Sequence, residues 1–580
     1  MRLCRFVVAL PLCASIALPC AAQSAPASKP IRLQRAYERM DEFVAQQMLL
    51  SGTPGLALAL TSREGLLRVQ TYGFADVKSR LPVATETLFE IGSISKSFTA
   101  IALLQLREQS KFDPQQPITK YLPWFQVPSK FAPVTGHHLL SHTSGIPRDR
   151  DVIPSSLFQV AGLRELWTGY APGARYAYSN IGFQILGYTL EELTQQDYGD
   201  VIRKRIFEPV GMSSSLPFFT HADRPRIATG YETLYDDRPS HRSHPLVEAP
   251  WLEYAAGDGS IAATPADLAA YLRMLLNRGI TARGRVISEE SFNLLTQRAI
   301  QTDREGKCWY GYGMGTYEEE GHIFIAHGGG MVGYSSMLLG DITAGLGVVV
   351  FVNGPGNPGR LADFALKCLR AALQNKDLPA MPAPDPPTRV KNAADYAGTY
   401  AAPDGRKLNL VAGSETLVLE HAGQKIVLER RGPDSFFVNH PDFALFLLRF
   451  AREQKKTDAK ESKPPEPGKV LEAIHGGDWY AGENYTGEKN FKPPKDWLAY
   501  PGHYRTQHMW FNNFRVILRK GQLYFAMPGG GEEELVELSP GLFQIGTEET
   551  AERIRFDTLV NARALRASVS GSDYYRVFTP

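Results

Sequence analysis

Alternation of hydrophobic and polar positions predicts two antiparallel strands near the start of the chain. Residues 55–60 and 66–73 have the apolar or alternating patterns of strands, and the polar segment 62–65 ends in the glycine of a tight turn. Apolar residues recur at helical spacing in three later segments, 96–110, 180–197 and 265–278. Strand-like runs return at 322–327 and 346–352. Strands at both ends with helices between them predict an antiparallel sheet flanked by helices, an α+β arrangement.

A proline-rich segment separates this region from the rest of the chain. Residues 378–387 include five prolines, a composition typical of a stiff, extended linker. Short alternating segments with glycine-containing turns follow, and they predict small antiparallel β units. The charged, proline-rich stretch 452–469 falls inside the first of these units, and we interpret it as a hairpin loop.

The β region contains an internal repeat. Residues 396–400 are echoed by 500–504, 448–450 by 554–556, and 478–480 by 573–575. Recurrence in the same order predicts a duplication with a period on the order of 100 residues. Two consecutive small β-barrels are therefore expected.

The N-terminus has the pattern of a secretory signal peptide. Met1–Arg5 is basic, Phe6–Leu18 is apolar, and small residues follow, so cleavage is expected near Ala22. The apolar run is too short to remain as a membrane anchor. The proline directly before Cys20 disfavours a lipoprotein signal. We therefore expect a periplasmic or secreted protein with no integral membrane segment after signal removal.

The composition narrows the possible partners. The chain has 63 Lys and Arg against 61 Asp and Glu, a formal net charge of +2, so no binding of nucleic acid is expected. Three of the five cysteines fall in the signal peptide, which leaves Cys308 and Cys368 either as a disulfide or as two free thiols. Neither a metal nor a cofactor is expected, since the histidines form no helical ligand pair with an acid beside it.

Ser93 and Lys96 form a Ser-x-x-Lys motif at a predicted helix start. Residues three apart share one helical face, so the ammonium can reach the hydroxyl. The first turn also offers unpaired backbone N–H groups, which favour developing negative charge. A desolvated lysine with a lowered pKa can take the serine proton, which makes Ser93 a candidate nucleophile and Lys96 its base. The alternative interpretation is a chance match on a solvated helix face.

A second candidate element is Tyr178-Ser179-Asn180, in which Ser179 or Asn180 would cap the next helix. Tyr178 could pass a proton between Ser93 and the leaving group if Lys96 lowered its pKa. Asn180 could hold Lys96 and donate to a substrate carbonyl. The alternative is an ordinary helix cap preceded by core tyrosines.

A third candidate element is a strand that ends in His327-Gly328-Gly329-Gly330. Glycines let another backbone approach closely and leave N–H groups free to polarise a carbonyl. The amides of Ser93 and Gly330 would together form an oxyanion hole. The alternative is a glycine-rich hairpin turn with a surface histidine.

These three motifs, with Leu-Leu-Ser-His-Thr-Ser-Gly-Ile-Pro at 139–147 and Ile-Phe-Glu-Pro-Val-Gly-Met at 206–212, closely resemble the penicillin-binding-protein and serine β-lactamase superfamily. Residues 35–375 are similar to the branch that holds class C β-lactamases, D,D-carboxypeptidases, D-aminopeptidases and related esterases. The resemblance implies a β-lactamase/transpeptidase-like fold and an acyl-enzyme mechanism.

The resemblance also implies a role for each motif. Ser93 would be the nucleophile, with Lys96 and Tyr178 as the shared acid and base. The implied substrate-binding residues are Asn180, His327, Gly329 and Gly330. One departure concerns His327, because class C β-lactamases carry at this position a lysine that helps to bind the β-lactam carboxylate. A largely neutral histidine is a weaker partner for an anion, so cleavage of amides, peptides or esters is expected ahead of β-lactam hydrolysis.

The tail resembles that of three-domain D-aminopeptidases, in which the final barrel lends a loop to the rim of the active site. Residues 527–534 are a candidate for such a loop, with an ordinary solvated hairpin as the alternative. The expected division of the chain is a signal peptide (1–22), a β-lactamase-like serine hydrolase domain (31–376), a linker (377–391), a first, lipocalin-like β-barrel (392–488) and a second β-barrel (489–580).

The expected function is therefore an exported serine hydrolase that cleaves amide or peptide bonds, with D-amino-acid peptides or amides as the preferred substrates. A carboxylesterase or a weak β-lactamase on the same site is an alternative. An α/β-hydrolase is disfavoured because the chain has no Gly-x-Ser-x-Gly elbow. The alternative of another class is a catalytically inactive binding or scaffold protein of the cell envelope.

Overall fold

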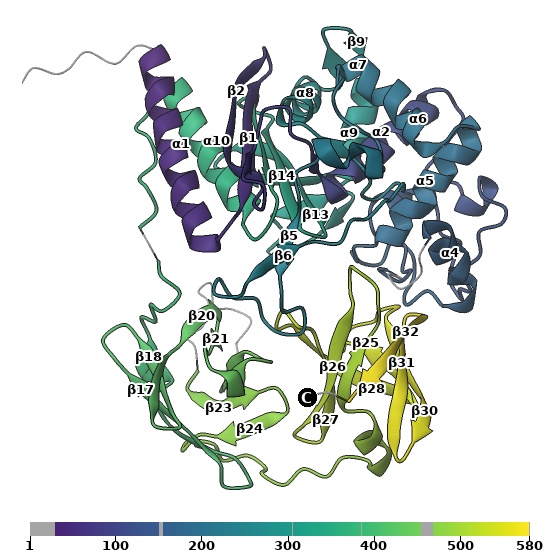
Figure 1. Cartoon of the computed structure of the whole chain (residues 1–580). Helices are drawn as coiled ribbons and strands as arrows, with labels where there is room; N and C mark the ends of the chain where they lie inside the picture. Colours follow the sequence, from purple (N-terminus) through teal and green to yellow (C-terminus); the bar gives the residue numbers. More distant parts are fainter. Residues whose placement is uncertain (1–28, 150–154, 304, 384, 454–467, 579–580) are drawn as a thin grey trace, which may run out of the picture.

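The computed structural model describes residues 29–149, 155–303, 305–383, 385–453 and 468–578 (Figure 1). The predicted signal peptide and residues 454–467 of the predicted hairpin loop lie outside the described residues. No helix within the described ranges has the length and apolar character that crossing a membrane requires.

The first part of the chain is built around a nine-stranded antiparallel sheet with the order β10-β11-β12-β13-β14-β15-β1-β2-β3. β1 (Gly55–Ser62) pairs with β2 (Leu66–Asp76) on one side and with β15 (Leu346–Val352) on the other. The remaining strands are β3 (Leu81–Pro82), β10 (Ile300–Gln301), β11 (Cys308–Tyr310), β12 (Gly315–Glu319), β13 (His322–Met331) and β14 (Tyr334–Asp341). The prediction that strands from both ends of this region meet in one sheet is confirmed.

Helices cover both faces of this sheet, which is why β1 is buried along its whole length. Its three leucines belong to the core under α1 (Lys29–Ser51) and α10 (Pro358–Leu373), which lie side by side in Figure 1. Its two alanines belong to the core shared with α2 (Ser95–Glu108) and α8 (Pro265–Leu276). The alternation of a strand thus divides one segment between two cores.

The helices predicted from periodicity are present as α2, α5 (Asn180–Thr194) and α8. The other helices of this layer are α3 (Gly136–Leu140), α4 (Ser156–Ala161), α6 (Tyr198–Ile202), α7 (Glu208–Val210) and α9 (Glu289–Leu295). The same unit contains short two-stranded sheets. In two of them β4 (Phe89–Glu90) pairs with β7 (Ala262–Ala263), and β8 (Ile280–Thr281) pairs with β9 (Gly284–Arg285). A third, β5 (Tyr231–Thr233) with β6 (Leu246–Glu248), reaches toward the β units in Figure 1.

The first β unit is a nine-stranded antiparallel sheet in the order β19-β18-β17-β16-β24-β23-β22-β21-β20. Its end strands β19 (Gln424–Val427) and β20 (Glu429–Gly432) are separated only by Leu428, so the sheet returns to its own start. The other strands are β16 (Gly398–Ala401), β17 (Lys407–Ala412), β18 (Leu417–His421), β21 (Ser435–Phe437), β22 (Leu448–Arg452), β23 (Val470–His475) and β24 (Asp478–Ala481).

The second β unit is a closed eight-stranded barrel, in which β25 (Gly502–Arg505) pairs with β32 (Ser572–Val577). Between them run β26 (Asn513–Arg519), β27 (Gln522–Ala526), β28 (Glu532–Ser539), β29 (Leu542–Ile545), β30 (Arg553–Val560) and β31 (Arg563–Val569). The two segments of one predicted echo, 396–400 and 500–504, have the same local structure. The Tyr400 hydroxyl donates to the Tyr396 carbonyl (2.9 Å), and the Tyr504 hydroxyl donates to the Tyr500 carbonyl (2.7 Å). Two successive antiparallel β units are therefore confirmed.

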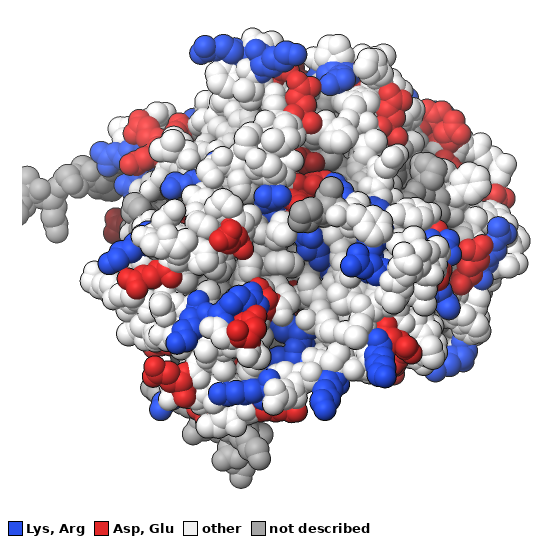
Figure 2. Space-filling model, turned by 60° about the horizontal axis from the view of Figure 1, so that its bottom comes forward, with Lys and Arg blue, Asp and Glu red and all other residues white. Residues whose placement is uncertain are grey.

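The β5–β6 loop contacts both β units and so connects them to the first part of the chain. Asp236 accepts hydrogen bonds from Arg505 (3.1 Å) and Asn512 (2.7 Å) of the second barrel. His241, in the same loop, lies 3.1 Å from the Glu429 carboxylate of the first β unit and stacks on Phe437. Oppositely charged side chains are interspersed over the face in Figure 2, in keeping with the small net charge. Contacts between the parts are thus specific ion pairs and hydrogen bonds.

Candidate active site

Ser93 and Lys96 lie where the chain enters α2. Ser93 is in a single 3₁₀ turn (Gly92–Ile94) directly before α2, and Lys96 is the second residue of that helix. The Lys96 Nζ donates to Ser93 Oγ (2.9 Å) and to the carbonyl oxygen of Asp258 (2.8 Å). The three-residue spacing therefore brings the amine to the hydroxyl, as the motif predicted.

Lys96 is fully buried, and this burial lowers its pKa to about 8. Removal from water disfavours the ammonium form, while the nearby Asp258 and Asp149 partly offset the effect. A substantial fraction of the amine is therefore neutral near pH 8, and a neutral amine can accept the proton of Ser93.

Tyr178 lies against the same amine. The Nζ of Lys96 is 4.9 Å from the centre of the Tyr178 ring, and the His142 ring packs on it at 4.2 Å between centroids. Burial raises the pKa of Tyr178, and a hydrogen bond with the Ser93 hydroxyl only partly opposes the rise. The condition set for its role as a base, a pKa lowered by Lys96, is not met, because desolvation outweighs the other effects. The phenol is protonated and is placed as a proton donor.

A buried histidine shapes the corner that carries Tyr178. His142 has a positive φ of 56°, and its Nδ1 accepts a hydrogen bond from the Ser179 backbone N–H (3.1 Å). Ser179 in turn caps α5, because its Oγ accepts from the Gly182 N–H (3.2 Å). His142 thereby holds Ser179 in the extended conformation that precedes α5, next to Tyr178 and Lys96.

Asn180 has a different partner from the one predicted. Its Nδ2 donates to Asp149 Oδ1 (2.7 Å), and its Oδ1 is buried without a hydrogen-bond partner. Of the described residues, Lys96 donates only to Ser93 and Asp258, so the predicted Asn180–Lys96 hydrogen bond is wrong. This Oδ1 is enclosed by protein and does not face the cleft, so the contact of Asn180 with a substrate stays a prediction.

Some residues around Lys96 could not be predicted from the sequence pattern, namely Asp258 and Asp149. Asp258 lies in a loop, its carbonyl holds Lys96, and its carboxylate accepts from the Tyr254 hydroxyl. Asp149 lies far from Asp258 in the sequence, and burial raises the pKa of Asp149 to about 6. Both acids reach Lys96 only through the tertiary fold, so no spacing rule could have found them.

His327 lies on β13 and is neutral. Its Nδ1 donates to the Gly328 carbonyl (2.7 Å), and its Nε2 accepts from the Tyr310 hydroxyl (2.8 Å). Burial lowers the pKa of His327 to about 4, with a further contribution from the charge of Lys96. The structure therefore offers no cation at the position where class C β-lactamases carry lysine.

The glycines after His327 allow two backbones to touch. A Cβ on Gly329 would lie 1.8 Å from the Ile91 carbonyl oxygen, and a Cβ on Gly92, at φ +51°, would lie 2.7 Å from the Gly330 nitrogen. A Cβ on Gly330 would meet nothing within 4 Å, so this glycine borders open space. The Gly330 amide thus lies beside the turn that carries Ser93, as an oxyanion hole requires.

These groups meet at a cleft of about 570 Å³. Of the predicted site residues, Ser93, Tyr178, His327, Gly329 and Gly330 line it, whereas Lys96 and Asn180 lie behind its wall. The other lining residues are Tyr176, Thr302, Cys308, Trp309, Tyr310, Gly315, Thr316, Tyr317, Ala326, Gly328, Ser335, Ser336, Met337, Asn357, Pro358 and Gly359. The aromatic content of this wall suits a substrate with an apolar acyl group.

The two cysteines of the described chain are free thiols. Cys308 lines the cleft, and burial together with Asp303 raises its pKa, so the thiolate needed for attack is disfavoured. Cys368 is buried in α10. Ser93 is therefore the better placed nucleophile.

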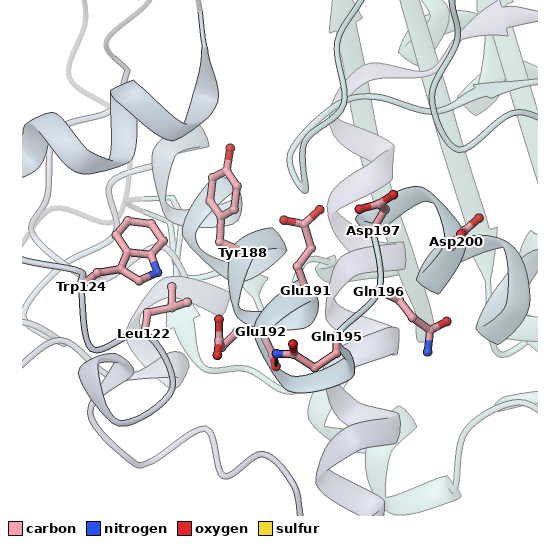
Figure 3. A pocket seen from close by; sticks show the side chains of 9 residues that line it. All are labelled: Leu122, Trp124, Tyr188, Glu191, Glu192, Gln195, Gln196, Asp197 and Asp200. Atoms are coloured by element: carbon pink, nitrogen blue, oxygen red, sulfur yellow. Dashed lines mark hydrogen bonds between the residues drawn. The ribbon is translucent and has the colours of Figure 1, made fainter.

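A separate hollow of about 510 Å³ lies at the C-terminal end of α5 (Figure 3). Tyr188 and Trp124 stand on one side of it, and acidic and amide side chains of residues 191–200 on the other. None of the predicted site residues lines this hollow, and it contains no nucleophile beside a base. The cleft at Ser93 has such a pair, and it is therefore the better candidate for the active site.

The second barrel reaches the catalytic corner through residues 546–552, between β29 and β30. Glu552 Oε1 accepts from the Arg148 backbone N–H (2.7 Å), and Arg175 donates to the Glu549 carbonyl and the Glu548 carboxylate (2.7 Å each). The loop predicted for this position, 527–534, is elsewhere: Glu532 pairs with Arg519 (2.9 Å) and with Arg449 of the first β unit (3.2 Å). The candidate loop 527–534 is therefore not the one at the catalytic corner, because folding of the barrel places a different hairpin against the catalytic unit.

Residues 40–371 match the Beta-lactamase family. The chain is similar to Penicillin-binding protein 4* of Bacillus subtilis (strain 168), at 26% identity over 383 residues, 62% of this chain and 82% of that protein. Penicillin-binding protein 4 of Amycolatopsis lactamdurans is 29% identical over 369 residues, 61% of this chain and 94% of that protein. The octameric penicillin-binding protein homologue from Pyrococcus abyssi shares the fold with a TM-score of 0.54 at 24% identity, over 77% of this chain and 99% of that chain.

Proposed function

The chain belongs to the β-lactamase family of serine hydrolases, and we propose that Ser93 is its nucleophile and that the preferred substrates are amides or peptides of D-amino acids. The observation that carries the proposal is the 2.9 Å hydrogen bond between a fully buried Lys96 and Ser93. A lysine whose pKa is lowered to about 8 is suited to act as a base. We further propose that the protein acts after export, as its N-terminal sequence indicates.

Acylation begins with neutral Lys96 taking the proton of Ser93. The serine Oγ forms a bond to the substrate carbonyl carbon, and the negative charge on the carbonyl oxygen is stabilised by the amides of Ser93 and Gly330. Each such donor contributes about 10²–10³ in rate. Collapse of this intermediate breaks the bond to the leaving nitrogen or oxygen.

The leaving group needs a proton, and Tyr178 is placed to supply it. Its hydroxyl is hydrogen-bonded to Ser93, and its raised pKa keeps it protonated. The proton that Lys96 took from Ser93 then restores the phenol, so no net charge accumulates. In the second half-reaction neutral Lys96 accepts the proton of water, whose oxygen forms a bond to the acyl carbon. The bond to Ser93 Oγ then breaks, Tyr178 returns a proton to Ser93, and the proton held by Lys96 restores the phenol.

Two observations support an amine-bearing substrate over a β-lactam. The neutral His327 supplies no cation for a β-lactam carboxylate. The Asp149 carboxylate lies 2.7 Å from the Asn180 amide and 3.4 Å from the Arg148 guanidinium, outside the cleft lining. Its charge, partly offset by Arg148, would act on a substrate ammonium through space. A carboxylesterase or a weak β-lactamase is the second candidate, since the aromatic cleft suits an apolar ester as well.

A matched turnover panel tests the proposal. D-alanyl and L-alanyl p-nitroanilides, a D-Ala-D-Ala peptide, p-nitrophenyl butyrate and nitrocefin are offered to the purified mature protein and to Ser93→Ala. Cleavage of a D-amino amide or peptide that is lost in Ser93→Ala supports the proposal. Turnover of the ester alone makes the protein an esterase.

A fluorophosphonate probe separates an enzyme from an inactive binding protein. If Ser93 is the nucleophile, the probe should form a covalent adduct that mass spectrometry locates on Ser93. Formation of the adduct should require neutral Lys96 as the base. Absence of an adduct together with absence of turnover would leave the cell-envelope binding or scaffold protein as the better interpretation.

A further inference from the structure

A second cavity lies where the catalytic unit meets the first β unit. Its volume is about 420 Å³, and its walls come from the end of α1, the β5–β6 loop, the start of α10 and residues 385–431. Asn357 lines both this cavity and the catalytic cleft, so the two spaces are neighbours. None of the residues assigned to the reaction lines it.

Three arginines from three separate segments converge on this cavity: Arg242, Arg360 and Arg431. Throughout the described ranges, none of the three forms an ion pair with an Asp or Glu side chain. The guanidinium groups of Arg431 and Arg360 lie over the rings of Phe437 (5.1 Å) and Phe43 (5.8 Å). Three like charges around one hollow repel each other, and an anion between them would relieve the repulsion.

The acids nearest the cavity are already engaged. Asp385 lines it but is paired with Arg430. Glu429 is held by the imidazole of His241 at 3.1 Å. Glu429 also acts on Arg431, where its charge partly opposes the effect of burial, so these acids offset the positive charge of the cavity only in part.

The start of α10 adds to the positive potential. Asn357 caps this 16-residue helix and Pro358 is its first residue, while no acidic side chain occupies the first turn. The N-terminus of a helix carries a partial positive charge from its unpaired N–H groups. This end of α10 borders the same cavity that Arg360 lines.

Apolar side chains form the remainder of the wall, namely Met48, Leu50, Leu246 and Leu361. A simple inorganic ion would leave this apolar surface in water, whereas an organic anion would cover it. We propose that the cavity binds a small organic anion, with a carboxylate, phosphate or sulfonate head between the three arginines and an apolar body against these side chains.

The probe 1-anilinonaphthalene-8-sulfonate, an aromatic sulfonate, tests the site on the full-length mature protein. Saturable fluorescence is expected, and Arg431→Gln should weaken it about tenfold, as loss of one charge-assisted hydrogen bond implies. The triple variant Arg242→Gln, Arg360→Gln, Arg431→Gln should lose the saturable component. Arg563→Gln, an exposed arginine of β31, is the matched control.

The uncharged N-phenyl-1-naphthylamine separates charge recognition from apolar binding, because its affinity should be equal for the parent protein and the triple variant. Equal affinity of the sulfonate for both proteins, with circular dichroism unchanged, would overturn the proposal. Ester turnover in the presence of the sulfonate identifies the source of the anion. If the sulfonate inhibits ester turnover by the parent protein but not by the triple variant, the site holds a distal group of the substrate. If turnover by the parent protein is unaffected, the site holds an independent ligand.

Discussion

The amine of Lys96 lies 2.9 Å from the hydroxyl of Ser93, and both groups belong to one turn of backbone at the start of α2. The same amine is held from the opposite side by the Asp258 carbonyl, 162 residues away in sequence. The two acceptors orient the amine toward Ser93, and burial, which disfavours the ammonium form, makes it easier to deprotonate.

Lys96→Met is expected to abolish most of the hydrolytic activity. Methionine fills a similar volume but has no proton-accepting nitrogen, and loss of a general base costs about 10²–10⁴ in rate. Turnover of p-nitrophenyl butyrate measures the loss, and thermal unfolding serves as the control, since removing a buried amine should not destabilise the fold. Activity within tenfold of the parent protein would contradict the role given to Lys96.

The pH profile of kcat/KM should rise through about pH 8. Lys96 acts as a base only when neutral, and its pKa is lowered to about 8, so activity falls as pH drops below that value. A neutral ester is the suitable substrate, because it does not titrate itself. A profile that is flat between pH 6 and about 9 would assign the base to another group.

His327→Lys is expected to speed acylation by nitrocefin about tenfold, because the new ammonium can pair with the β-lactam carboxylate. His327→Asn is the matched control, since asparagine keeps a hydrogen-bonding side chain without the charge. Stopped-flow absorbance measures the acylation rate. Equal rates for the two variants would show that this position does not contact the carboxylate.

Glu90 should destabilise the folded protein increasingly as the pH rises. Its carboxyl group is buried, which raises its pKa to about 8, whereas the unfolded chain ionises it near pH 4.5. The folded state holds the proton that the unfolded state releases, so the free energy of unfolding falls between about pH 4.5 and about pH 8. Glu90→Gln removes this penalty, which is about 3 kcal/mol at pH 7.

Urea unfolding followed by tryptophan fluorescence checks this effect at pH 5 and at pH 7.5. The gain in midpoint from Glu90→Gln should be larger at the higher pH. Glu289→Gln, on the exposed first turn of α9, should give no such difference. A gain independent of pH would show that the stabilisation is not electrostatic.

Glu552→Ala is expected to lower kcat about tenfold although Glu552 lies in the second barrel. Its carboxylate accepts the Arg148 N–H, and the Arg148 carbonyl accepts the Asn180 N–H (3.0 Å), so the residue supports the catalytic corner indirectly. Glu552→Gln keeps the acceptor oxygen and should restore activity. Full activity of the alanine variant would exclude a positioning role.

Short-range sequence patterns were sufficient to predict many helices and strands of this protein and the position of its Ser-x-x-Lys motif. The Ser-x-x-Lys spacing, the helical periodicity of α2, α5 and α8, and the alternation of the strands are short-range properties, since each depends on neighbours within a few residues. The motif order identified the superfamily, and the repeated tyrosine motifs identified two similar β units. The roles given to Ser93, Lys96 and Tyr178 are predictions that the proposed experiments test.

Contacts between distant segments were decided only by the tertiary structure. Asp258 and Asp149 reach Lys96 from other loops, and their burial, which shifts the pKa values, is a property of the packed core. The same reason explains why the predicted partner of Asn180 was wrong and why the candidate loop 527–534 is not the one at the catalytic corner. Sequence spacing fixes which residues share a local face, whereas desolvation and long-range partners depend on how complete elements pack.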